Sequence, residues 1–125
     1  MFEKVKGSGK VVALHSCGNI GMILGDLIDI GLDIYQTVQP EVYDLGMIKT
    51  QYGKNLSFWG GISTQRLLPF AKPEELKSAV LEIIRVMSDN GGYIASPTHR
   101  VPADVPPENI VALVEVLKYQ TASVR

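Results

Sequence analysis

Short apolar runs alternate along the chain with longer segments in which apolar residues recur at helical spacing. The runs are mostly continuous and do not alternate with polar residues, which is typical of strands buried on both faces of a parallel sheet. The predicted strands are Lys10–Ser16, Leu32–Val38, Asn55–Ile62 and Tyr93–Ser96. The predicted helices are Asn19–Ile30, Pro40–Tyr52, a third that begins at Pro73 and a last that opens with Pro106 and Pro107.

Apolar stripes and terminal residues support the helix assignments. Asn19 is a candidate N-cap, at a helix start whose backbone N–H groups could also bind an anion. Gly31 is the expected C-terminal glycine of the same helix. Glu74 and Glu75 lie in the first turn of the Pro73 helix, where the helix dipole favours negative charge. The expected apolar faces are Ile20, Ile23, Leu24, Leu27 and Ile28; Leu45, Ile48 and Tyr52; Leu76, Ala79, Val80, Ile83, Ile84 and Met87; and Ile110, Leu113, Val114 and Leu117.

These elements make four strand–helix units, which predict an α/β domain with a parallel sheet and right-handed crossovers. A small open sheet and half of a (β/α)8 barrel both fit this order. A complete barrel needs roughly 250 residues, and residues 1–125 form a single domain of half that length. Four units leave two sheet edges open, so we expect either a homo-oligomer or a partner half-barrel to cover them, unless helices shield the edges of a self-sufficient domain.

Composition narrows the function classes. The net charge of −1 and the absence of a basic cluster argue against a nucleic-acid partner. The longest apolar runs are only a few residues, such as Val11–Leu14, so no membrane span is expected. A start of Met1-Phe2-Glu3-Lys4 lacks the apolar core of a signal peptide. Together with a single cysteine, this predicts a cytoplasmic protein in a reducing environment.

The scarce reactive side chains follow two of the predicted strands. His15 and Cys17 leave the end of the first strand, and His99 leaves the end of the fourth. In parallel α/β folds, active sites gather at the carboxyl ends of the strands, so all three are expected at one edge. Imidazole and thiolate are good zinc ligands, and a catalytic zinc has three protein ligands with one open position. The alternative is that Cys17 is only a small buried apolar residue.

Other polar and glycine residues near the strand ends are candidate substrate-binding groups. Glycines allow a ligand to approach the backbone closely, although a turn that needs positive φ explains a glycine pair equally well. A glutamine within a buried strand needs a partner, either in a pocket or on a neighbouring backbone group. An arginine beside His99 could bind a substrate carboxylate. The candidates are Gln36, Gln39, Trp59, Gly60, Gly61 and Arg100.

Motifs at the four strand ends resemble the uroporphyrinogen decarboxylase family, in order and in spacing. The resemblance extends from about Val5 to Tyr119 and implies the C-terminal half of a (β/α)8 barrel. The matching segments are His15-Ser16-Cys17-Gly18-Asn19-Ile20, Asp33-Ile34-Tyr35-Gln36-Thr37-Val38-Gln39-Pro40, Phe58-Trp59-Gly60-Gly61-Ile62-Ser63-Thr64-Gln65, Gly92-Tyr93-Ile94-Ala95-Ser96-Pro97-Thr98-His99 and Val105-Pro106-Pro107-Glu108-Asn109-Ile110.

The resemblance implies two activities. The decarboxylases of haem synthesis remove acetate carboxylates from a tetrapyrrole without a cofactor, and carry a Gly-His-Gly segment where this chain has Thr98-His99-Arg100. The zinc methyltransferases move methyl groups between corrinoid proteins and thiols, and carry a His-x-Cys pair where His15 and Cys17 stand. Their third ligand is a cysteine near the last strand, where this chain has His99. The expected function is zinc-dependent methyl transfer; the alternatives are tetrapyrrole decarboxylation and a silent half-barrel that needs a partner half.

Overall fold

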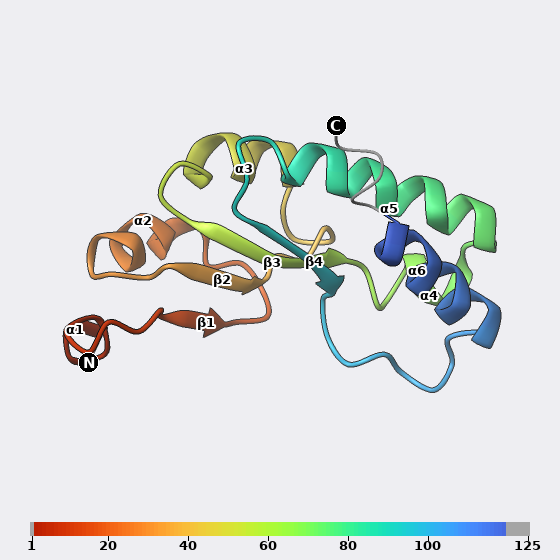
Figure 1. Cartoon of the computed structure of the whole chain (residues 1–125), viewed down its shortest axis with the longest axis horizontal. Coiled ribbons are helices and arrows are strands. Elements are labelled where there is room, and N and C mark those ends of the chain that lie inside the picture. Colours follow the sequence, from red (N-terminus) through yellow and green to blue (C-terminus); the bar gives the residue numbers. More distant parts are fainter. Residues whose placement is uncertain (1, 120–125) are drawn as a thin grey trace.

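A computed structural model describes residues 2–119 of the chain (Figure 1). The four strands form one sheet in the order β1-β2-β3-β4, and every neighbouring pair is parallel. In chain order the elements are α1 (Phe2–Lys6), β1 (Ala13–His15), α2 (Gly21–Asp29), β2 (Ile34–Thr37), α3 (Leu45–Tyr52), β3 (Ser57–Ile62), α4 (Leu67–Phe70), α5 (Pro73–Met87), β4 (Tyr93–Pro97) and α6 (Pro107–Tyr119). The expected α/β fold with sequential parallel strands, as in part of a (β/α)8 barrel, is confirmed.

The helices cover one face of the sheet (Figure 1). Tyr35 of β2 and Phe58 of β3 point into this layer and are fully buried. Around them pack apolar side chains from α2, α3 and the end of α5. A second cluster joins the end of β3 to α4, α5 and α6, and Leu68 and Val80 are fully buried there. Burying this apolar surface is the main force that holds the helices on the strands.

The opposite face of the sheet is open, which corrects the expectation of strands buried on both faces. His15, Gln36, Trp59 and Ile94 are aligned across the four strands. Trp59 is 39% exposed and Ile94 is 46% exposed. Strands with near-continuous apolar runs need cover on both faces. The open face is therefore the one that would point into a closed barrel.

Several predicted boundaries moved. The helix predicted from Pro40 is α3, and it begins at Leu45. The Asp44 side chain caps it by accepting a hydrogen bond from the Met47 N–H at 2.8 Å. Asn19 is not the N-cap of α2; it precedes the cap residue Ile20 and accepts from the Gly21 N–H at 2.9 Å. The short helices α1 and α4 were not predicted. Each has too few residues to show helical periodicity.

Gly31 does end α2 as expected. Its φ is +104°, and the Leu32 N–H donates to the Leu27 carbonyl at 2.9 Å, the pattern of a Schellman motif. Ile23 was expected on the buried face of this helix but is 50% exposed. Leu24 is the fully buried residue of α2, so the buried stripe is narrower than the apolar one.

The last helix is rotated from its predicted face. Val114 was expected to face inward but is 44% exposed. The buried residues Asn109, Ala112, Leu113 and Val116 are spaced i, i+3, i+4 and i+7, which makes one helical stripe. Asn109 was overlooked because it is polar; its amide donates to the carbonyl of Leu68 in α4 and to that of Ala71, the residue after α4, at 2.8 Å each.

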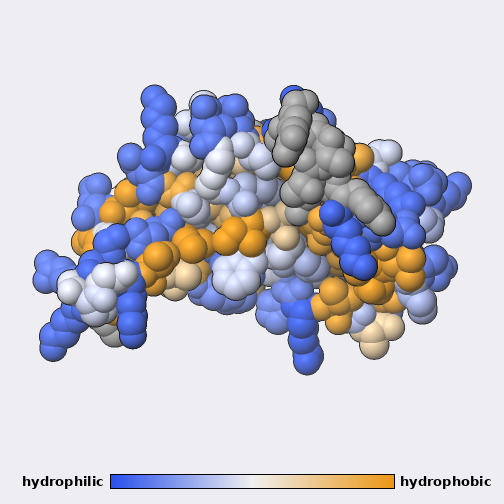
Figure 2. All heavy atoms as spheres, in the orientation of Figure 1, coloured by the Kyte–Doolittle hydropathy of each residue, from blue (hydrophilic) through white to orange (hydrophobic). Residues whose placement is uncertain are grey.

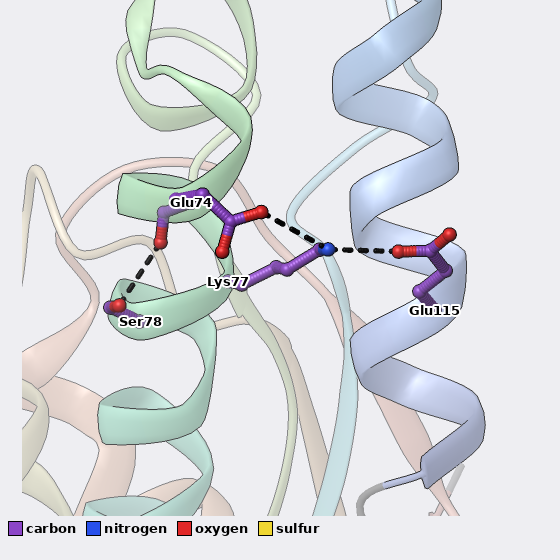
Figure 3. Close-up of polar contacts among 4 residues, drawn as sticks. All are labelled: Glu74, Lys77, Ser78 and Glu115. Atoms are coloured by element: carbon purple, nitrogen blue, oxygen red, sulfur yellow. Dashed lines mark hydrogen bonds and ion pairs between the residues drawn. The ribbon is translucent and has the colours of Figure 1, made fainter.

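An ion pair joins α5 to α6 at the surface (Figure 3). Lys77 Nζ lies 2.9 Å from Glu115 and 3.3 Å from Glu74. Hydrogen bonds to these two carboxylates raise the pKa of Lys77, and Glu115 has the larger effect. Figure 2 shows hydrophobic residues at the surface over the strands and around α4 and α6, with hydrophilic residues at the periphery. Within residues 2–119, no helix has the length and apolar character that a membrane crossing requires.

Candidate metal centre

The two histidines and the cysteine converge at the carboxyl edge of the sheet. His15 is the last residue of β1, Cys17 lies two residues further on, and His99 follows β4. One ligand atom from each lies within 4.8 Å of the other two. The two imidazole rings have centroids 5.8 Å apart, at an interplanar angle of 72°. Among residues 2–119, this is the one group of three or more His, Cys, Asp or Glu side chains spaced to hold a metal ion.

Gln36 lies beside His15 in the sheet and contacts both ends of this cluster. Its Oε1 atom is hydrogen-bonded to His15 Nδ1. Its Nε2 atom donates to the carbonyl of Thr98, the residue before His99, at 3.4 Å. Of the two alternatives that the sequence left open, the structure shows Gln36 bonded to protein groups. It joins the β1 end of the site to the β4 end.

Two tyrosine hydroxyl groups, of the buried Tyr35 and the partly buried Tyr43, hold the loop that carries Cys17. Tyr35 donates to the Ser16 carbonyl at 3.2 Å, and Tyr43 donates to the Gly18 carbonyl at 3.1 Å. Tyr43 also accepts from the Ile20 N–H at 2.8 Å. Burial is the main cause that raises the pKa of Tyr35, and the hydrogen bond with Tyr43 is the second. This hydroxyl therefore stays protonated at physiological pH. The loop is therefore fixed on both sides of Cys17.

The donor set fits zinc. Zn–N bonds of about 2.0–2.1 Å and Zn–S bonds of about 2.3 Å put neighbouring ligands of a tetrahedral site roughly 3.3–3.8 Å apart. Cys17 Sγ and His15 Nε2 are 3.5 Å apart, within that range, and the three ligand atoms together span up to 4.8 Å. All three side chains are exposed, so solvent or substrate reaches the cluster. Two imidazoles and one thiolate leave a fourth position open, as catalytic zinc sites do.

The Gly60-Gly61 pair has a packing reason. A β-carbon on Gly60 would lie 2.0 Å from the Thr37 carbonyl oxygen, and φ at Gly60 is +124°. A β-carbon on Gly61 would lie 2.8 Å from the Tyr93 hydroxyl, which donates to the Gly60 carbonyl at 2.7 Å. Trp59 does not enter the core: its side chain is on the open face, in register with Gln36. Both glycines have positive φ, +124° at Gly60 and +81° at Gly61, as the turn alternative expects, and their backbone is tightly packed.

The remaining candidates lie near the same edge. Gln39 Oε1 accepts from the Gly18 N–H at 3.2 Å, so it supports the Cys17 loop. Arg100 is exposed and directly follows His99. Two groups were missed by the sequence reasoning. Tyr43 supports the loop as described, and Glu41 accepts a hydrogen bond from Ser63 through Oε1 while its Oε2 is buried without a partner among the described residues.

A hollow of about 810 Å³ lies between α3 and α5, at the other end of the strands. Lys49 lines it, and the Lys49 ammonium donates to the Gly91 carbonyl at 2.5 Å. Burial lowers the pKa of Lys49. This end of a parallel α/β fold serves stability, whereas the carboxyl end carries chemistry. The cluster of His15, Cys17 and His99 is therefore the candidate functional site.

The fold and the cluster define half of a β/α barrel with a candidate metal centre at the strand ends. The sequence model of the family described as Uroporphyrinogen decarboxylase (URO-D) matches residues 1–119, so the chain belongs to this family. A methyltransferase from Methanosarcina mazei has a similar fold, with a TM-score of 0.73 and 22% sequence identity. The likeness covers 98% of this chain and 34% of that one, so this chain spans about a third of its length. No curated protein matches the sequence.

Proposed function

We propose that this chain is the metal-binding part of a zinc-dependent methyltransferase, which moves a methyl group from a corrinoid to a thiol. The observation that carries the proposal is the convergence of His15, Cys17 and His99 within 4.8 Å. The family match and the fold shared with a methyltransferase support it. The corrinoid is either a small molecule or the cofactor of a partner corrinoid protein.

His15, Cys17 and His99 would hold the zinc, and the open position would take the acceptor thiol. Bound zinc would lower the pKa of that thiol and make it a thiolate at neutral pH. The thiolate sulfur supplies the electron pair of the new C–S bond. The corrinoid would be the methyl donor and would keep the Co–C electron pair, and the thiol proton would pass to solvent.

The protein groups around the cluster orient and shield the reactants. Trp59 and Ile94 form an apolar pair on the open face, in register with Gln36 and His15, suited to the flat face of a tetrapyrrole-like ring. We assign Arg100, exposed beside His99, to an anionic group of the substrate. Gln39 keeps the Cys17 loop in place through the Gly18 N–H.

Metal analysis of protein purified without chelator tests the proposal. We expect close to one zinc per chain in the unchanged protein and close to none in Cys17→Ala. Ser16→Ala is the matched control, because the structure uses Ser16 only through its backbone at this site, and it should keep the zinc. Zinc far below one per chain, and the same in Cys17→Ala, would contradict the proposal.

Decarboxylation of a tetrapyrrole is the second candidate. The family description and the position of His99 after β4 favour it. In that case no cofactor is needed, and His99 contacts the substrate. Anaerobic turnover of uroporphyrinogen by this chain together with the rest of a barrel is the test, and a lack of product counts against it.

A silent half-barrel that needs a partner half is the third candidate, and the open sheet face favours it. A partner half, on the same or on another polypeptide, would cover Trp59 and Ile94; a second copy of this chain is the alternative cover. Light scattering distinguishes these cases. A stable monomer with no affinity for an N-terminal half-barrel would contradict assembly, and activity of this chain alone would exclude silence.

A further inference from the structure

Gln36 makes two side-chain contacts whose chemistry is linked. One is to a backbone carbonyl, at Thr98, and the other is to the ring of His15. A carbonyl oxygen only accepts hydrogen bonds, so the amide NH2 of Gln36 must face Thr98. The amide oxygen then faces His15. Because that oxygen also only accepts, His15 Nδ1 must carry the proton.

The same logic fixes the other ring nitrogen. A neutral imidazole has one N–H, so a proton on Nδ1 leaves a lone pair on Nε2. His15 Nε2 faces Cys17, and the distance from Nε2 to Cys17 Sγ is 3.5 Å. Neutral histidine in water favours the opposite tautomer, with the proton on Nε2. The tautomer required for a ligand at Nε2 therefore depends on a hydrogen bond from outside the cluster.

We propose that Gln36 is a positioning residue that holds His15 as the Nδ1–H tautomer and couples it to the Thr98–His99 segment. The inference rests on the proposed metal site and deepens it. Gln36 acts from the middle of the sheet, where β2 lies in register with both β1 and β3. This places one amide between the two chain segments that supply the three ligands. Groups that hold ligating histidines in this way commonly affect metal affinity strongly.

Three variants separate the two arms of Gln36. Gln36→Met keeps the length of the side chain and removes both hydrogen bonds. Gln36→Glu keeps an acceptor for His15 and removes the donor to Thr98. Gln51→Met makes the same chemical change on the exposed side of α3, where the amide donates to the Tyr52 hydroxyl, and serves as the matched control. Circular dichroism and thermal melting show whether each variant is folded.

The first readout needs no metal. Long-range ¹H–¹⁵N NMR of the metal-free protein, at a pH well above the ordinary histidine pKa of about 6.5, reports which ring nitrogen of His15 carries the proton. We expect Nδ1–H in the unchanged protein, in Gln36→Glu and in Gln51→Met. We expect Nε2–H to dominate in Gln36→Met. An Nε2–H tautomer in the unchanged protein, or no change in folded Gln36→Met, would overturn the inference.

The second readout is zinc affinity, by competition with a chromogenic chelator. Gln36→Met should bind zinc about 10- to 100-fold more weakly than the unchanged protein. Gln36→Glu keeps the acceptor for His15 and should bind zinc more tightly than Gln36→Met. Gln51→Met should match the unchanged protein. Equal affinities in folded Gln36→Met and the unchanged protein would overturn the inference. If the unchanged protein has the expected tautomer and binds no zinc, the proposed function fails while the positioning of His15 by Gln36 stands.

Discussion

The backbone of Gly60 lies against the carbonyl of Thr37, so close that a β-carbon on Gly60 would be 2.0 Å from the carbonyl oxygen. Gly60 and Thr37 are paired on the two inner strands of the sheet, between β1 and β4, whose ends carry the site. At this spacing a side chain at position 60 would force β2 and β3 apart.

We predict that Gly60→Ala destabilises the fold by roughly 3 kcal/mol or more, because it combines a backbone clash with a positive φ. The free energy of unfolding from urea titration is the measurement. Gly25→Ala is the control: position 25 lies in α2, where an added β-carbon meets nothing within 4 Å. That change should stabilise the helix by about 0.5–1 kcal/mol. A Gly60→Ala protein as stable as the unchanged chain would contradict the strand packing described here.

Tyr43→Phe removes a hydroxyl that donates to the Gly18 carbonyl and accepts from the Ile20 N–H. We predict a loss of about 1–3 kcal/mol of stability and weaker zinc binding, because partly buried backbone groups lose their partner and the Cys17 loop loosens. Tyr52→Phe is the matched control, since its hydroxyl makes only a long bond to the Gly21 carbonyl, at 3.4 Å, and accepts from the exposed Gln51 amide. Equal stability and zinc affinity in the two variants would count against the loop support.

Lys49 makes the free energy of unfolding depend on pH in the alkaline range. Burial lowers its pKa in the folded state, so between that pKa and the unfolded value of about 10.5 the unfolded chain binds more protons. Stability from this group therefore rises as pH increases through that window, and the burial penalty is fully present below it. We predict that the rise is absent in Lys49→Met. Urea midpoints across alkaline pH, taken as the difference between the two proteins, measure it; identical pH profiles would contradict the prediction.

The single tryptophan reports on the open sheet face. Trp59 is 39% exposed, so its fluorescence should resemble that of a solvated indole and should be quenched by iodide. A partner half-barrel should shift the emission to shorter wavelength and protect it. Ile94→Glu puts a charge on the same face and should weaken assembly by about 2 kcal/mol or more while the chain stays folded. Emission that is already that of a buried indole in the monomer would contradict the open face.

The strands and the site edge were predictable because both follow from short-range patterns. Apolar runs ended by reactive residues put His15 and Cys17 after one strand and His99 after another, and parallel pairing brings such ends together. The order of the motifs within the family fixed the half-barrel. Nothing in these inferences needed a side-chain contact to be known.

Three of the misses, at the open sheet face, at α6 and at Gln36, depend on tertiary contacts. One face of the strands is exposed because the four strands form an open sheet. The apolar runs of β1–β4 instead suit the strands of a closed barrel, which are buried on both faces. Val114 is exposed because α6 turns the stripe of Asn109 and Leu113 toward α4 and α5, and a polar residue in that stripe conceals it. The contact of Gln36 with Thr98 joins residues 62 positions apart and has no local signal.

The central claim is that His15, Cys17 and His99 bind one metal ion together. X-ray absorption at the zinc edge of the loaded protein tests it most directly. We predict a first shell with one sulfur and two imidazole nitrogens, from which the sulfur is lost in Cys17→Ala and one imidazole is lost in His99→Ala. A shell without sulfur, or one unchanged by the loss of either side chain, would contradict the account.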